Sequence, residues 1–113
     1  MDDKGSLSQL VLVLSTEVDQ NHAEALASAL LERRLVACVS LYPVQSHYRW
    51  QGKLEKSSEV QLLIKTTPDR LDALLVAMNE LHSYDTPELI HWRASASAAY
   101  GDWAVEAVAS QGF

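Results

Sequence analysis

The chain has 113 residues, a single cysteine and a formal net charge of −6 at pH 7. This length predicts one domain, and a lone cysteine excludes an internal disulfide and a four-thiolate zinc or iron–sulfur site. The acidic balance argues against a nucleic-acid-binding protein, which needs a basic surface. No apolar stretch approaches the ~18 residues of a membrane-spanning helix. The first ten residues also lack the basic start and apolar core of a signal peptide, which predicts a cytoplasmic protein.

The first half of the chain changes from a strand pattern to a helix pattern. Residues 1–9 are expected to form a polar, flexible terminus, and residues 10–113 a single domain. Residues 10–14 are all apolar, which predicts a strand buried on both faces. Apolar residues between 23 and 31 recur at helical spacing, with Asn21 and Glu24 as a capping pair at the helix start.

A long hairpin follows the first helix. One extended region runs from about residue 35 to 50, and after Gln51-Gly52 a second ends near Thr66. Glycine supplies the positive φ that a two-residue hairpin turn requires. Sixteen straight residues would span roughly 50 Å, more than the ~35 Å diameter of a compact domain of this size. Either the strand bends at Pro43 within a monomer, or the tip projects and pairs with another copy in a closed homo-oligomer.

The second half repeats the order of the first. Thr67 and Pro68 are suited to begin a helix, and a leucine-rich stripe continues it to residue 81. Residues 89–94 predict a short strand and residues 97–109 a last helix. The order β-α-β-β-α-β plus a C-terminal helix predicts an α+β, ferredoxin-like (split βαβ) fold, with the first two helices on one face of a four-stranded antiparallel sheet.

Two residues are candidate metal ligands. Cys38 lies in an apolar stretch and is first interpreted as a small core residue, although a thiolate with an imidazole would suit Cu(I) or zinc. His82 is the imidazole expected to join it, but at a helix end it could equally interact with the helix dipole. The chain has no zinc-type motif, so any metal site must be assembled from distant segments or several subunits.

A second group of residues combines polar and aromatic side chains at predicted strand and loop ends. The group consists of Trp50, Glu59, Lys65, Tyr84 and Glu88. It predicts either a small-ligand cleft at a subunit boundary or an interface in which Lys65 pairs with Glu59 or Glu88. The sequence contains no nucleophile elbow, phosphate-binding glycine loop or metalloprotease helix. A non-enzymatic protein is therefore predicted.

Several segments are distinctive through their order and spacing along the chain: RLVACV at 34–39, YRWQGK at 48–53, LHSYDTPEL at 81–89, and the pair Tyr100 and Trp103. Together they resemble the CutA family of divalent-cation tolerance proteins. The resemblance implies a homotrimer similar in shape to the PII signalling proteins, and an association with copper or other divalent cations. It also implies that Cys38 faces a cleft between subunits. The family often has proline where this chain has Ser83, and this departure predicts a looser turn.

Two functions therefore remain open. The first is a cytoplasmic, trimeric protein that binds divalent metal, copper before others, and supports metal-ion tolerance. The second is a PII-like sensor or scaffold, in which the inter-subunit cleft binds a small anionic metabolite through Lys65 or engages a protein partner.

Overall fold

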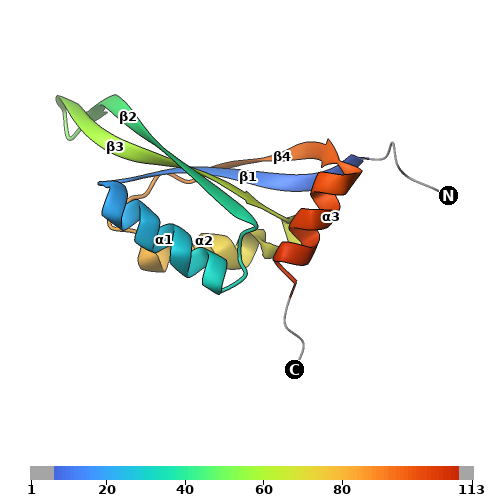
Figure 1. The fold of residues 1–113 in the computed structure, drawn as a ribbon. Coiled ribbons are helices and arrows are strands. Elements are labelled where there is room, and N and C mark those ends of the chain that lie inside the picture. Colours follow the sequence, from blue (N-terminus) through green and yellow to red (C-terminus); the bar gives the residue numbers. More distant parts are fainter. Residues whose placement is uncertain (1–6, 110–113) are drawn as a thin grey trace.

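A computed structural model describes residues 7–109 and confirms the predicted α+β, ferredoxin-like fold (Figure 1). The helices α1 and α2 cover one face of the sheet, and α3 lies across its end (Figure 1). None of the helices in this part of the chain is long and apolar enough to cross a membrane. In chain order the elements are β1 (Leu7–Glu17), α1 (Gln20–Glu32), β2 (Cys38–Trp50), β3 (Lys53–Thr66), a 3₁₀ turn (Pro68–Arg70), α2 (Leu71–Leu81), β4 (Ile90–Ser97) and α3 (Ala98–Ala107).

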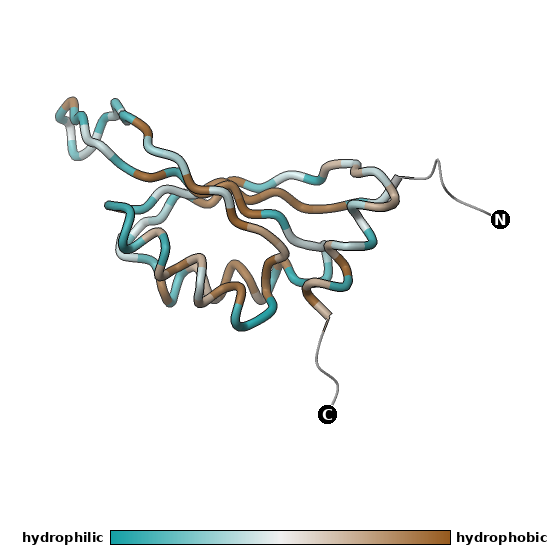
Figure 2. The backbone as a smooth tube through the Cα atoms, in the orientation of Figure 1, coloured by the Kyte–Doolittle hydropathy of each residue, from teal (hydrophilic) through white to brown (hydrophobic). Residues whose placement is uncertain are grey.

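The four strands form one antiparallel sheet in the order β2-β3-β1-β4. Residues alternate between the two faces, so Val13 and its partner Ile64 both point toward α1 and α2. Figure 2 shows the hydrophobic residues gathered along the central strands and on the helices beneath them. The fully buried part of this core holds large apolar side chains from strands and helices alike: Leu30, Leu62, Ile64, Leu74, Met78, Val11, Val13 and Val36.

The opposite face of the sheet is also apolar, but little of the chain between residues 7 and 109 covers it. The register places Leu12 opposite Trp92 and Leu14 opposite Ile90 on this face, which we call the open face. Trp92 is 42% exposed and Ile90 56% exposed. Among the described elements only α3 packs here, at one end, where Leu10 joins Ala104 and Val108 in a small second core. The open face therefore leaves large apolar side chains in contact with water.

The long hairpin of β2 and β3 has an uninterrupted register and projects beyond the helices (Figure 1). Residues pair one to one from Cys38 opposite Lys65 to Trp50 opposite Lys53, and Pro43 pairs with Val60 without a bulge. Proline is tolerated because β2 is an edge strand. The turn at Gln51-Gly52 has φ values of 49° and 80°, as predicted for a two-residue turn. The described chain is 57 Å long, so the hairpin outruns the body of the subunit.

Strand and helix starts differ from the sequence prediction at three places. β1 begins at Leu7, because pairing with β4 continues to Ser97, so only residues 1–6 of the predicted flexible terminus lie outside the described residues. Asp19, not Asn21, caps α1, since its carboxylate accepts the His22 N–H at 2.8 Å. Residues 35–37 are buried in the connection before β2 rather than in the strand.

The start of α2 also differs from its prediction. Thr67 makes no side-chain bond to a helical N–H, and its hydroxyl instead donates to Asp69. Pro68 opens a 3₁₀ turn, and the α-helix proper begins at Leu71. The cap of α3 is regular, because the Ser97 hydroxyl accepts the Tyr100 N–H at 3.3 Å.

Candidate functional site

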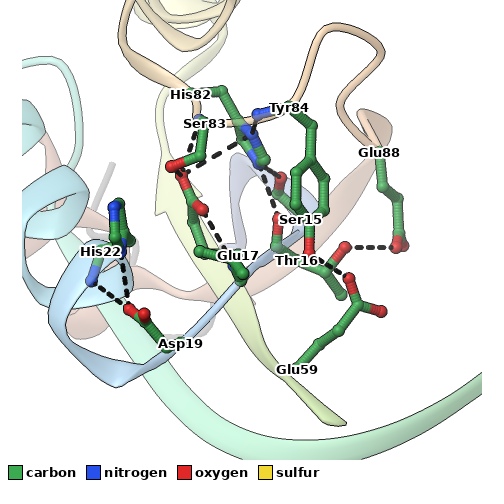
Figure 3. Close-up of polar contacts among 11 residues, drawn as sticks. Ser15, Thr16, Glu17, Asp19, His22, Glu59, His82, Ser83, Tyr84 and Glu88 are labelled. Carbon is green, nitrogen blue, oxygen red and sulfur yellow. Dashed lines mark hydrogen bonds and ion pairs between the residues drawn. The ribbon is translucent and has the colours of Figure 1, made fainter. Parts of the chain in front are cut away.

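Polar side chains from distant parts of the sequence meet where β1 ends (Figure 3). Ser15, Thr16 and Glu17 close the strand, and all three are buried. The connection from α2 to β4, residues 82–89, lies against them (Figure 3). The last helical turn of α2 delivers His82 in an extended conformation, with φ −70° and ψ 147°, which turns the chain toward β1. The buried end of β1 is thus packed against one loop, residues 82–89.

The imidazole of His82 is completely buried and engaged at both nitrogens. Nε2 lies 2.6 Å from the carbonyl oxygen of Thr16, which can only accept, so this nitrogen carries the proton and donates. Nδ1 accepts the backbone N–H of Tyr84 at 3.0 Å. A neutral ring satisfies both contacts. A metal at His82 would therefore have to displace one of these two partners.

Ser15, His82 and Glu17 contain the residue types of a hydrolytic triad, but their protons are in the wrong places. In such a triad the imidazole donates from Nδ1 to the carboxylate, and Nε2 accepts the serine proton. Here Nε2, which lies 3.2 Å from the Ser15 hydroxyl oxygen, already carries the proton that it donates to Thr16. Nδ1 accepts the Tyr84 N–H, so it has no proton to donate to the Glu17 carboxylate 3.6 Å away. The cluster fixes structure and does not activate Ser15.

The carboxylate of Glu17 ties the loop to the end of β1. One oxygen accepts the Val18 N–H at 2.9 Å, and the other accepts both the N–H of Ser83 at 3.0 Å and its hydroxyl at 3.1 Å. These bonds tie Ser83 to the end of β1, while the looser turn expected at Ser83 stays a prediction. Serine supplies a backbone N–H, which proline lacks, and the buried carboxylate uses it. Glu17 does not stand out in the sequence, since a glutamate after an apolar strand resembles a solvent-exposed loop residue.

Three of the five predicted cleft residues meet beside this cluster, namely Glu59, Tyr84 and Glu88 (Figure 3). The Tyr84 hydroxyl donates to Glu59 at 2.5 Å, and the Thr16 hydroxyl donates to Glu88 at 3.4 Å. Burial, and then the hydrogen bond to Glu59, raise the pKa of the Tyr84 phenol above its ordinary value. The phenol therefore remains a hydrogen-bond donor throughout the neutral range.

The other two predicted cleft residues lie elsewhere in the same chain. Lys65 lies six residues along β3 from Glu59, roughly 20 Å at the usual rise of a strand. Trp50 pairs with Lys53, six residues in the other direction from Glu59. Trp50 and Lys65 therefore cannot line one cleft with Glu59 inside a single subunit.

Lys65 has local partners on the open face. Its ammonium group lies 3.7 Å from the Cys38 sulfur and 3.4 Å from the Ser40 hydroxyl, both on β2. Its polar contacts are thus with β2, not with Glu59 or Glu88. Leu10, Leu12 and Tyr100 help to line an open groove of about 510 Å³, in which Lys65 is the charged side chain. The groove has the apolar walls and single charge that suit an anionic organic molecule.

Cys38 and His82, the predicted metal ligands, are not brought together within one subunit. Cys38 is level with Lys65 and hence with Leu12, whereas His82 lies at Thr16, four residues further along β1 and two strands away. Between residues 7 and 109, no group of three histidine, cysteine, aspartate or glutamate side chains converges as a metal site would require. Cys38 is half-buried on the open face. Joint metal binding by the two residues stays a prediction.

Comparisons with known proteins agree on one family. Residues 11–107 match the family model of the CutA1 divalent ion tolerance protein. The divalent-cation tolerance protein CutA of Pectobacterium atrosepticum is 49% identical over 85 residues, which are 74% of this chain and 77% of that protein. The protein of the same name from Escherichia coli K12 is 43% identical over 91 residues, 80% of this chain and 81% of that one.

Solved structures share the fold over nearly the whole chain. CutA from Synechococcus elongatus superposes with a TM-score of 0.88 and 38% identity, covering 96% of this chain and 100% of that one. The periplasmic divalent cation tolerance protein CutA from Archaeoglobus fulgidus gives a TM-score of 0.85 and 29% identity, covering 88% and 99%.

Proposed function

The chain belongs to the CutA1 divalent ion tolerance protein family, and on this basis we propose that it supports tolerance by binding the metal itself, copper before other divalent cations. The observation that carries the proposal is the position of Cys38. Its thiol is half-buried on a sheet face that the described chain covers only at one end, and it lies beside the ammonium group of Lys65. A soft thiolate selects copper, as Cu(I), or zinc over hard cations such as magnesium.

We further propose that three copies assemble through this face into a PII-like homotrimer. Apolar surface of this kind is unfavourable in water and typically marks a contact between proteins. The projecting hairpin adds exposed aromatic residues, Tyr48 and Trp50, to the same face of the sheet. Assembly would also explain why Trp50, Glu59 and Lys65 are spaced too far apart to form one cleft in one chain. In a trimer, Cys38 becomes three thiols.

Copper titration of purified variants tests the metal proposal. We expect Cys38→Ser to lose the tight Cu(I) binding of the wild type, measured by competition with a chelator, and titrations with Cu(II) and Zn(II) rank the ions. His82→Ala tests the second predicted ligand, whose ring would first have to release Tyr84 or Thr16. Ser40→Ala and His47→Ala are matched controls, one beside Lys65 and one an exposed histidine. Equal, weak binding by all of these proteins would reject both ligands.

The groove beside Lys65 favours a second candidate function, a sensor of a small anionic metabolite. Its apolar walls and single ammonium group would hold a carboxylate or phosphate group on an organic body. A ligand that binds only the folded protein raises its melting temperature. We expect any stabilising anion to lose its effect in Lys65→Met. If no anion stabilises the protein, this second function is rejected.

We also propose that the protein works in the cytoplasm and without a catalytic step. A free cysteine suits a reducing compartment, and the proton arrangement at His82 is the reverse of the one that activates a serine. Fractionation of cells that express the protein tests the first point. The Archaeoglobus relative is named a periplasmic protein, and recovery of this protein from the periplasm would contradict the proposal. Hydrolysis of a panel of activated esters that disappears in Ser15→Ala would contradict the second.

A further inference from the structure

Glu17 is a buried carboxylate for which neither proposed function has a role. Its side chain is 1% exposed, at the last residue of β1. Removing a charge from water is costly unless hydrogen bonds replace the lost hydration. Here the replacement is nearly complete: three donors surround the two oxygens, and two of the three belong to Ser83. These hydrogen bonds fix the position of the Glu17 carboxylate, and the carboxylate in turn fixes the positions of its donors.

Ser83 lies between the two residues that fix the candidate cleft. Before it, His82 bonds to the Thr16 carbonyl group, and after it, Tyr84 reaches Glu59 (Figure 3). The Tyr84 N–H also donates to His82, so the backbone from 82 to 84 is held at each residue. We propose that Glu17 is a positioning residue: by holding Ser83 it fixes the loop that presents Tyr84 and Glu88 beside Glu59 and Thr16.

Both oxygens of Glu17 are needed for this role. A glutamine at this position can offer an oxygen to only one side, so its NH₂ group would face either the Val18 N–H or the two donors of Ser83. Glu17→Gln therefore preserves the size of the side chain and leaves a backbone N–H without an acceptor. Replacing Ser83 by proline removes both of its donors and leaves one oxygen of a buried charge without a partner. The extended conformation of His82 is the one that a residue before proline adopts.

A double-mutant cycle on metal-free protein tests the pairing. We expect Ser83→Pro to lower the melting temperature by about 5 °C or more while Glu17 is present, because an unpaired buried charge is expensive. In the Glu17→Ala background the same change should cost much less, because no carboxylate is left without donors. Equal shifts in the two backgrounds would overturn the proposed pairing.

A second readout separates positioning from general stability. We expect Glu17→Gln to raise amide hydrogen exchange in residues 82–89 about tenfold or more, with no change in α1, at a temperature where the variant is fully folded. The NMR signals of the Tyr84 ring, assigned by their absence in Tyr84→Phe, should move in the same variant. Exchange that rises equally in α1, or Tyr84 signals that stay fixed, would overturn the role. Neither measurement involves metal, so a failed copper proposal leaves this one standing.

Discussion

Trp92 provides the sharpest test of assembly through the open face. It is 42% exposed on an edge strand, opposite Leu12. A large aromatic side chain has up to about 250 Å² of surface, so roughly 100 Å² of Trp92 remains available for contact with another copy. At about 25 cal/mol per Å², burying it contributes about 2.6 kcal/mol per subunit and nearly 8 kcal/mol per trimer.

Trp92→Ala should therefore weaken assembly while leaving the subunit folded. A loss of nearly 8 kcal/mol raises the concentration at which half of the trimer dissociates by roughly a thousandfold. Sedimentation equilibrium over a dilution series measures this shift, and circular dichroism checks the fold. Val76→Ala is the matched control, because Val76 is 61% exposed on α2, away from the open face. A wild-type monomer at micromolar concentration, or equal shifts in the two variants, would refute the reasoning.

Three further changes test the packing and ionisation of single residues. Gly101→Ala should lower the free energy of unfolding by about 1–3 kcal/mol in urea, because the new methyl group would overlap the side chain of Ser8, and adding Ser8→Gly should restore part of the loss. Ser97→Ala removes the cap of α3 and should cost about 1 kcal/mol in the same assay; an unchanged midpoint would contradict the capping role. For Tyr84, burial and Glu59 raise the pKa, so the phenol contributes stability below the ordinary value of about 10 and loses it as pH rises through the higher folded pKa. Tyr84→Phe should flatten this alkaline decline in melting temperature, and an equally steep decline would reject the assignment.

The helices and the hairpin turn were predictable because their signals are local. Ala23, Leu26 and Leu30 lie on one helical face in the sequence and are buried in the structure. Gln51-Gly52 forms the two-residue turn that glycine indicates. The cap of α1 was not predictable to the residue. Asp19 and Asn21 are both good cap residues, and only the backbone conformation at Asp19 decides between them.

The candidate site was predictable in its residue types but not in its arrangement. The hairpin turn fixes the register of β2 and β3, so the spacing of Trp50, Glu59 and Lys65 could have been worked out from it. Glu17 could not have been found in that way. Its burial depends on donors at Ser83, 66 residues further along the chain, and on the way α2 delivers them. Long-range polar pairs of this kind leave no periodic signal in one sequence.

X-ray absorption spectroscopy of the copper-loaded protein tests the metal proposal most directly, because it identifies the ligand atoms. The copper edge of the wild-type protein should show sulfur in the first coordination shell, and Cys38→Ser should replace it with nitrogen or oxygen. Loading of the wild type through nitrogen and oxygen alone would contradict the proposal that Cys38 on the open face holds the metal.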